Sequence, residues 1–403
     1  MEDKQISASE LAQQVRQFVD AEVLPNETRL AAGDAASREL AAELARRARR
    51  AGVFGSFYPQ GHGGRLARLT DYVVVAEQEG RSEYAPGILG ADATLDAYML
   101  SRHASPSVRE RFFLPLVRGE AVSCYAMSEP DSIGSIPATM ACRARLHGGL
   151  WQLSGRKWFI CRSQVANFAT VVARTSDGPA ERALSMIVAP TDAAGFEVVR
   201  PLSLLGRWQG QGELAFSEVK VPADHLLGGE GQGIALMQQR LGLGRLLRSA
   251  HWLGLAQRCF ELMCGRIHSP RGQLARLADK QLARARVYAV HRGIAAARAL
   301  LQDAAAKFDA GVANSIEVAM AKLAASEALS AAADNAIQIM GAEGLSEWTP
   351  LSGIYRAAKT THILDGADDA LVSTVGRQLL EATSPGLTFD SLRPSARLSV
   401  VMR

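Results

Sequence analysis

The chain has 403 residues, 48% of them hydrophobic and 21% charged, which fits an ordinary globular protein of two or three domains. Its formal charge of +4 is too small to indicate a nucleic-acid-binding protein by itself, and no run of 18 apolar residues predicts a membrane span. Five cysteines without a CxxC pair exclude a disulfide framework, and the polar N-terminus is unlike a secretion signal, so we expect a cytoplasmic protein.

Residues 1–123 are predicted to form an all-helical N-terminal domain. Leu11, Val15 and Phe18 recur at helical spacing in "SELAQQVRQFVDAEV", and the pattern continues in "DYVVVAEQEGR" and "SVRERFFLPLVRG". The stretch "YPQGHGG", which lies between the first two of these segments, is predicted to be a loop by its Pro and Gly content.

Residues 124–230 have the pattern of a small central β-domain. Short runs rich in β-branched and aromatic residues, such as "LWQLSGRKWFI", "FATVVART" and "LSMIVAP", are separated by Gly, Pro and Asp. Closely spaced strands of this kind predict a small β-barrel or sandwich. No G-x-G-x-x-G motif follows a predicted strand, which argues against a Rossmann dinucleotide-binding domain.

Residues 231–382 return to helix and are predicted to form a C-terminal four-helix bundle. Their long Ala-rich segments favour helices that pack closely on one another. The chain as a whole is therefore predicted to be an α+β protein. The tail, residues 383–403, carries Arg393, Arg397 and Arg403; a solvated tail is the favoured interpretation, and a nucleic-acid-binding patch is the alternative.

Two polar segments are candidate parts of a functional site. "AMSEPDSIGSIPA", residues 126–138, combines hydroxyls with small residues whose backbone amides could approach a phosphate. "ILDGADD", residues 363–369, places three aspartates around one glycine. A carboxylate on this turn could act as a general base, or it could cap the helix that is predicted to follow. The eight histidines never form an H-x-x-H or H-E-x-x-H pair, so no metal site is predicted.

Six motifs, in the same order, resemble those of the acyl-CoA dehydrogenase family, and the resemblance runs from about residue 9 to residue 382. They are "YAMSEP" followed by "GS", "SGRKWFI", "FSEVKVPADHLLGGEGQG", "GLGRLLRSAHWLGLAQ", "IQIMGAEG" and "PLSGIYRAAKTTHILDGADD". The fourth and the last are most similar to the branch that includes the tenth and eleventh human members. The resemblance implies that family's fold, with a helical domain, a small β-barrel domain and a four-helix bundle.

The resemblance also implies that FAD is the cofactor, bound between the β-domain and the bundle and completed by a neighbouring subunit. Ser128 corresponds to a hydroxyl that binds the flavin pyrimidine edge, and Phe159 and Cys161 take the places of a flavin-packing Trp and of a hydroxyl near flavin N5. The implied cofactor-binding residues are Tyr125, Met127, Ser128, Gly134, Ser135, Phe159 and Cys161, together with Arg271, Gln338, Gly341 and Gly344 across the subunit boundary.

The predicted flavin site departs from the family pattern in three places. Its loop has Ile133 inserted before the Gly-Ser step and Ile136 in place of an Asp. Trp158 is one residue out of register and, on a regular strand, would point away from Phe159. No R-x-x-F-G motif is present, and Arg271 and Gln273 are the nearest candidates for its contacts, so we expect FAD to be held more loosely than in a typical member.

The resemblance implies that the catalytic base is Asp365, where the family usually has Glu, followed by Gly366. The shorter side chain withdraws the carboxylate by roughly 1.5 Å. Burial against the flavin and the acyl chain would make the carboxylate a stronger base. Arg245 matches an arginine near the acyl-CoA site, and Arg245 and Gly366 are the implied substrate-binding residues. Asp368 and Asp369 are expected to be first-turn helix charges.

These observations leave three functions to compare. The favoured one is FAD-dependent dehydrogenation of an acyl-CoA, or of a carrier-bound acyl thioester, to the trans-2-enoyl product in fatty-acid or secondary metabolism. It implies a homodimer or homotetramer and an electron-transfer flavoprotein as partner. The second is a family member with a degraded flavin site that joins a hetero-oligomer or catalyses another acyl-thioester reaction. The third is a DNA-associated relative that is not a dehydrogenase.

Overall fold

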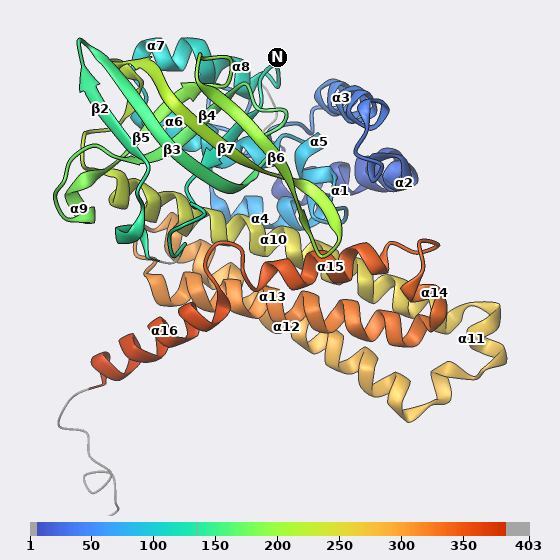
Figure 1. Cartoon of the computed structure of the whole chain (residues 1–403). Coiled ribbons are helices and arrows are strands. Elements are labelled where there is room, and N and C mark those ends of the chain that lie inside the picture. The colour runs from blue at the N-terminus through green and yellow to red at the C-terminus, as the bar shows by residue number, and fades with distance from the viewer. Residues whose placement is uncertain (1–5, 135, 384–403) are drawn as a thin grey trace, which may run out of the picture.

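The computed structural model describes residues 6–134 and 136–383, which form helices, then a sheet, then helices (Figure 1). The α+β prediction is confirmed. The predicted boundaries between the domains stay predictions. The three tail arginines, on which the nucleic-acid interpretation depended, lie outside the described residues. Of the helices in the described ranges, none is long and apolar enough to cross a membrane.

The N-terminal part consists of short and medium-length helices. They are α1 (Ala8–Phe18), α2 (Glu27–Leu30), α3 (Ala35–Arg50), α4 (Leu69–Glu79), α5 (Ala85–Ile88), α6 (Thr94–His103), α7 (Pro106–Val108) and α8 (Leu114–Val117). Ser7 and Glu10 begin α1 with a capping box, in which each side chain accepts a backbone N–H of the other residue. Leu11 and Val15 follow one turn apart and are fully buried. Helix α1 packs on α4, and α4 packs on the C-terminal bundle, so these helices share one apolar core.

An eight-stranded sheet forms the centre of the chain. Its strands are β1 (Ser123–Ala126), β2 (Arg143–His147), β3 (Leu150–Cys161), β4 (Phe168–Arg174), β5 (Leu184–Pro190), β6 (Phe196–Leu204), β7 (Arg207–Pro222) and β8 (Leu226–Leu227), with the short helix α9 (Ala180–Ala183) before β5. The strand order is β6-β7-β3-β2-β4-β5-β8, and β1 pairs with β4. Along β4, Phe168 and Val172 join a core shared with helices, whereas Ala169 and Val171 join a core built from the strands themselves. One face of the sheet therefore packs against helices, and side chains from several strands pack together on the other face.

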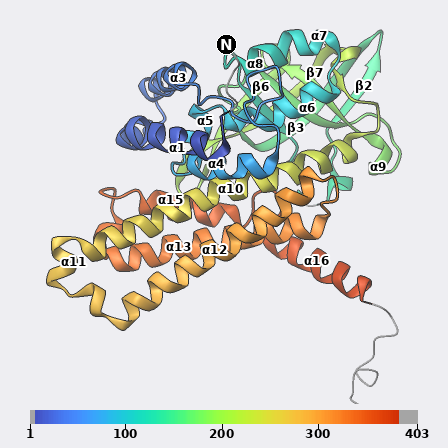
Figure 2. The same cartoon turned by 180° about the vertical axis from the view of Figure 1, so that it is seen from behind.

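Three long helices dominate the C-terminal part. Its helices are α10 (Gly233–His268), α11 (Pro270–Leu274), α12 (Gln281–Asp309), α13 (Ser315–Met340), α14 (Ala342–Leu345), α15 (Leu351–Thr361) and α16 (Asp368–Ala382). Helices α10, α12 and α13 pack on one another and α15 packs on α13, while α11 and α16 lie at opposite ends of the bundle (Figure 2). Buried alanines in α13, such as Ala321, Ala325 and Ala332, let the helices approach closely.

Two glycines let α4 and α10 cross at short range. A Cβ on Gly254 would lie 2.1 Å from the carbonyl oxygen of Glu77, and a Cβ on Gly80 would lie 2.1 Å from that of His251. A side chain at either position would force the two helices apart. The crossing holds the loop after α4 against the middle of α10, and the cavity described below is lined by both segments.

Candidate active site

The predicted base, Asp365, lies in a tight turn between α15 and α16. Asp365 has φ of +57° and Gly366 has φ of +103°, so two successive residues have positive φ angles. A Cβ on Gly366 would also lie 3.1 Å from Nη2 of Arg245, so both the positive φ and the lack of space favour glycine at this position. Helix α16 begins at Asp368 with Ala367 as its N-cap. The alternative interpretation of Asp365 as the helix cap is therefore wrong.

Two cationic side chains hold the backbone of this turn. Arg245 Nε, on α10, donates to the carbonyl oxygen of Asp365 at 2.8 Å. Lys322 Nζ, on α13, donates to the carbonyl oxygen of Gly366 at 3.1 Å. The Lys322 side chain is completely buried and forms an ion pair with Asp368. We call Lys322 and Asp368 the base-turn clamp.

Further hydrogen bonds surround Asp368 of the base-turn clamp. Its Oδ2 accepts from Ser326 Oγ at 3.0 Å and lies 2.5 Å from His362 Nδ1. The other ring nitrogen of His362 lies 2.7 Å from Ser330 Oγ. Asp368 and Asp369 do lie in the first turn of α16, as expected, but Asp368 is only partly exposed and is held in this network, while Asp369 is exposed. A network of this size resists displacement of the turn that it supports.

The Asp365 side chain faces Arg248, a residue that the motif comparison did not single out. Its Oδ2 lies 2.7 Å from Arg248 Nε, and the Asp365 side chain is only 14% exposed. The carboxylate of Asp365 raises the pKa of Arg248, and the Cys161 thiol of the sheet domain contributes in the same direction. Arg248 follows Arg245 by three residues, so spacing along one helix face could have indicated it.

Strand β3 ends irregularly where the resemblance places the flavin. A β-bulge interrupts the β3–β7 pairing between Lys157 and Ile160. Phe159 has φ of +52° and is 43% exposed, and its ring centroid lies 4.8 Å from that of Trp158. The expectation that Trp158 points away from Phe159 is wrong, because the bulge breaks the alternation of a regular strand. Cys161 follows, and Gln211 Nε2 lies 3.7 Å from its sulfur.

A second buried lysine holds the start of the predicted flavin loop. Lys157 Nζ donates to the backbone oxygen of Met127 at 2.7 Å and to Glu129 Oε1 at 2.8 Å. Glu129 also accepts from the backbone N–H groups of Ala141 and Cys142, at 2.6 and 3.0 Å. We call Lys157 and Glu129 the flavin-loop clamp. The sequence analysis missed both residues, although they stand in two of the quoted motifs.

The tip of the flavin loop is open to solvent. Gly134 is exposed, and a Cβ on it would lie 3.6 Å from Ser128 Oγ. Ser135 lies outside the described residues. Ile133 and Ile136, the two departures from the family pattern, are 56% and 46% exposed. Gly134, the described residue of the predicted phosphate-binding step, is therefore accessible to a ligand from solvent.

Several buried polar atoms in and around this loop make no hydrogen bond with the described chain. They are the hydroxyls of Tyr125, Ser132 and Ser163 and the side-chain oxygen of Gln164. Arg240 stacks over the Tyr125 ring at 4.2 Å. Buried polar groups are normally satisfied by protein, water or ligand, so this set fits a polar ligand such as the edge of FAD.

The other predicted FAD contacts gather at the far end of the bundle. Arg271 Nη1 lies 3.0 Å from Glu343 Oε2, which brings α11 against the turn that contains Gly341 and Gly344. Gln338 is exposed on the last turn of α13. This end, marked by α11 and α14, lies opposite the end from which α16 leaves (Figures 1 and 2). One chain therefore does not bring these residues to its own Asp365.

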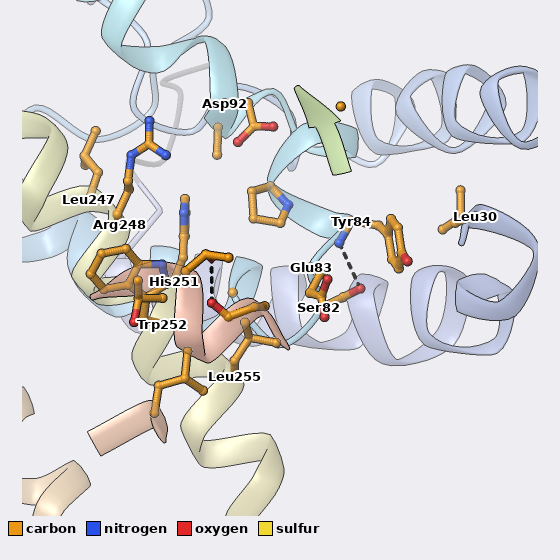
Figure 3. A pocket seen from close by; sticks show the side chains of 18 of the residues that line it. Leu30, Ser82, Glu83, Tyr84, Asp92, Leu247, Arg248, His251, Trp252 and Leu255 are labelled. Atoms are coloured by element: carbon orange, nitrogen blue, oxygen red, sulfur yellow. Dashed lines mark hydrogen bonds between the residues drawn. The ribbon is translucent and has the colours of Figure 1, made fainter. Parts of the chain in front are cut away.

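A cavity of about 380 Å³ opens beside the base turn (Figure 3). It is lined by α10, the loop after α4, α15 and the tip of the β6–β7 hairpin. It includes Arg248, which contacts Asp365, and follows α10 as far as Leu255. From Leu247 to Leu255 this is about 12 Å along the helix axis. An elongated cavity that begins at a carboxylate can hold a chain whose reacting end lies at that carboxylate.

No group of three or more His, Cys, Asp or Glu side chains in the described ranges is arranged to hold a metal ion.

Three family models match the chain, one for each part of the fold. The acyl-CoA dehydrogenase N-terminal domain matches residues 7–120, the middle domain residues 124–219 and the C-terminal domain residues 231–380.

Individual proteins are similar along most of the chain. Acyl-CoA dehydrogenase family member 11 of Rattus norvegicus is 30% identical over 393 residues, which is 92% of this chain but 50% of that protein. The chain thus spans about half the length of this relative. "Probable acyl-CoA dehydrogenase FadE2" of Mycobacterium tuberculosis is 31% identical over 346 residues, 83% of this chain and 84% of that protein.

Solved structures have the same fold. The "Structure of a putative acyl-CoA dehydrogenase from Mycobacterium abscessus" matches with a TM-score of 0.86 and 29% identity, over 94% of this chain and 98% of that one. A glutaryl-coenzyme A dehydrogenase in complex with glutaryl-CoA matches with a TM-score of 0.83 and 26% identity, over 93% and 95% of the two chains.

Proposed function

The chain belongs to the acyl-CoA dehydrogenase family, and from this premise we propose that it catalyses the FAD-dependent α,β-dehydrogenation of an acyl thioester. The observation that carries the proposal is the Asp365–Gly366 turn. Its carboxylate is mostly buried, contacts Arg248 and lies beside an elongated cavity. The product would be the trans-2-enoyl thioester.

Asp365 is the proposed base. It must be ionised and fixed in place to remove the weakly acidic α-proton of a thioester. Arg248 Nε lies 2.7 Å from the carboxylate and helps to orient it, and Arg245 and Lys322 hold the backbone that carries it. The proton would pass from the substrate α-carbon to a carboxylate oxygen of Asp365.

Arg245 and Arg248 are proposed to favour the enolate that develops on the thioester. Burial lowers the pKa of Arg245, and Asp365 raises that of Arg248, but both side chains are cationic at neutral pH. Fixed positive charge near the place where negative charge develops lowers the barrier because little reorganisation is needed during the reaction. Gly366 would leave room for the thioester beside the base.

When bound, FAD would supply the acceptor for the hydride that leaves the β-carbon. We propose that Tyr125, Met127, Ser128, Gly134, Ser135, Phe159 and Cys161 hold it on one subunit, and that Arg271, Gln338, Gly341 and Gly344 hold it from a second copy. The unpartnered polar atoms around β1 and β3 support the first group. The distance of the second group from Asp365 of the same chain supports a homodimer or homotetramer. A cytoplasmic electron-transfer flavoprotein is the proposed electron acceptor.

The test is an anaerobic titration of the FAD-loaded protein with acyl-CoA thioesters of increasing chain length. Loss of the oxidised-flavin absorbance, together with an enoyl-CoA product detected by mass spectrometry, is the expected result. A protein that binds both FAD and acyl-CoA but neither loses this absorbance nor forms the enoyl product would not be a dehydrogenase. A role in a hetero-oligomer or in another acyl-thioester reaction would then be favoured.

A further inference from the structure

Glu83 is a carboxylate in the cavity wall without a partner. It lies in the loop after α4 and makes no hydrogen bond or ion pair within the described part of the chain. Burial raises its pKa. A partly buried carboxylate without a hydrogen-bond donor is costly, and such groups usually serve a ligand. Figure 3 shows Glu83 on the same side of the cavity as Tyr84, with Arg248 on the opposite side.

Arg207, at the tip of the β6–β7 hairpin, lines the same part of the cavity. One of its terminal nitrogens, Nη2, donates to the Tyr84 hydroxyl at 2.5 Å and lies 3.5 Å from the carbonyl oxygen of Ala31. The other, Nη1, makes no hydrogen bond with the described residues. Because Tyr84 fixes the plane of the guanidinium, Nη1 is a positioned donor without an acceptor.

Gly353 on α15 shows how close these two free groups lie. A Cβ built on it would be 3.4 Å from Glu83 Oε1 and 3.5 Å from Arg207 Nη1. The two atoms are therefore at most about 7 Å apart, yet they do not form an ion pair. A single polar atom can bridge a gap of up to about 5.8 Å, because each such bond is about 2.9 Å long, and the separate nitrogen and oxygen of a carboxamide can bridge a wider one.

This pair lies at the end of the cavity remote from the proposed base. Gly353 precedes Thr361 on α15 by eight residues, about 12 Å along the helix. Thr361 also lines the cavity, and the Asp365 turn follows it in the chain. A group held between Glu83 and Arg207 would therefore be near the far end of an acyl chain whose α-carbon lies at Asp365.

We propose that Glu83 and Arg207 form a specificity site for the distal end of the acyl group, and that this end carries a neutral group that both donates and accepts hydrogen bonds: a hydroxyl or a carboxamide. The proposal rests on the proposed function for the position of the thioester. It adds that the substrate is an ω-polar acyl thioester and not a plain fatty acyl thioester.

The charges of the two residues exclude the other simple end groups. An ammonium would pair with Glu83 but be repelled by Arg207. A carboxylate would pair with Arg207 but would bring a second acidic group against Glu83. A methyl group would leave both charged groups desolvated and unpaired, which is the costliest outcome for a buried polar site. A hydroxyl or carboxamide alone accepts from Arg207 and donates to Glu83 at once.

The test measures binding by titration calorimetry on the FAD-loaded protein, with CoA thioethers that lack the carbonyl and cannot react. Hexyl, ω-hydroxyhexyl, ω-carboxamidohexyl, ω-aminohexyl and ω-carboxyhexyl thioethers form one series, and the octyl compounds form a second. We expect the hydroxyl or carboxamide member to bind at least about tenfold more tightly than the alkyl member of the same length. The stronger of the two identifies the end group.

Two variants link any preference to these residues. Glu83→Leu should remove the preference or reverse it toward the alkyl compound, whereas Glu197→Leu, at an exposed carboxylate on β6, should leave it unchanged. Gly353→Ala should weaken binding of the polar compounds by filling the space between Glu83 and Arg207. This variant is expected to fold, because alanine is a better helix former than glycine.

Five results would overturn the proposal, and the first four concern the order of affinities. They are tightest binding by the alkyl compound, by the ammonium compound or by the carboxylate compound, and a polar preference that survives in both variants. Absence of binding by every thioether would also contradict it, because the cavity would then not be the acyl site. A polar preference without flavin reduction by the matching thioesters would leave the specificity site intact and reject the dehydrogenase chemistry instead.

Discussion

Lys157 in the sheet domain and Lys322 in the bundle are both fully buried and perform similar tasks. Each is neutralised by one carboxylate, Glu129 or Asp368, and each donates to a backbone carbonyl of a proposed active-site segment. Burying a lysine is costly, and the cost is tolerated only with good pairing and further hydrogen bonds. The chain therefore uses the same device twice to fix a loop that bears functional groups.

The two clamps differ in what lies beyond them. The base-turn clamp continues into Ser326, His362 and Ser330, and Asp365 is mostly enclosed. Beyond the flavin-loop clamp, the loop is exposed to solvent at Gly134. A catalytic base must be positioned accurately, and the residues that support the Asp365 turn all come from the same chain. If this loop binds FAD together with a second subunit, as proposed, that subunit would complete its support.

Among the supporting residues, Lys322 should have the largest effect. Lys322→Met keeps the length of the side chain but leaves Asp368 without its cation, which should cost about 3–5 kcal/mol of stability. Release of the Gly366 carbonyl should displace Asp365, and a shift of about 1 Å can slow the reaction by roughly 100-fold. Flavin reduction by acyl-CoA, measured by stopped flow, should slow accordingly while the FAD content is unchanged.

The exposed Lys359 on α15 offers a matched control, and Lys359→Met should behave as wild type. The double variant Lys322→Met/Asp368→Asn should regain much of the lost stability without regaining the rate, since it removes the unpaired charge but does not restore the contact with Gly366. A folded Lys322→Met protein that reduces flavin at the wild-type rate would show that the clamp is only structural.

Lys157→Met should weaken the binding of FAD and not slow the chemical step. Loss of the contacts with Met127 and Glu129 would free the start of the flavin loop, and we expect the dissociation constant for FAD to rise about tenfold or more. The rate of reduction per bound flavin should change little. Fluorescence titration of the apoprotein with FAD measures the first quantity, and Lys220→Met, at an exposed position on β7, is the control. A change in the rate per bound flavin without a change in affinity would reverse the assigned roles.

Substitution of Gln338, at the α11–α14 end of the bundle, should have a smaller effect on FAD binding, and this effect should depend on the second subunit. Gln338→Ala should weaken FAD binding by up to about tenfold, the value of one hydrogen bond to a charged group. Gln14→Ala, at an exposed position on α1, should not. Mixing Gln338→Ala subunits with Asp365→Asn subunits should restore part of the activity, because a mixed oligomer contains one site with both native residues. Without any such complementation, the shared-site arrangement would be wrong.

The smallest expected effect is a pH-dependent change in stability at Glu83. Burial raises its pKa above the ordinary value of 4.5, so the folded protein holds this proton more tightly than the unfolded chain. Its contribution favours folding most below pH 4.5 and is lost as the pH rises through the raised pKa. Glu83→Gln should therefore raise the Tm by a few degrees at neutral pH, and the gain should vanish toward pH 4.5 in calorimetric scans. A gain that is equal at both pH values would contradict the assigned cause.

Much of the fold could be predicted because its signals are local. Helical spacing, strand composition and ordered motifs indicated the helices, the sheet and the family, including the similarity to the branch of members 10 and 11, which the relatives confirm. The buried lysines could not be predicted in this way. Lys157 and Glu129 are 28 residues apart, and Lys322 and Asp368 are 46 apart, so no short pattern joins either pair.

Local pattern also failed where the backbone departs from regular geometry. The alternation that separates Trp158 from Phe159 assumes an unbroken strand, and a bulge brings their rings together. Arg248 was overlooked because the motif directed attention to Arg245, one turn earlier on α10. These misses concentrate around the proposed site, where a sequence is expected to depart from the simplest folding rules.

The most direct test of the proposed chemistry compares wild type with Asp365→Asn, both loaded fully with FAD. The asparagine keeps the size and polarity of the side chain but cannot accept the α-proton. Flavin reduction by acyl-CoA, followed by stopped flow without oxygen, should slow by about 10²- to 10⁴-fold, while FAD and thioether binding stay nearly the same. Reduction at the wild-type rate would contradict the assignment of Asp365 as the base.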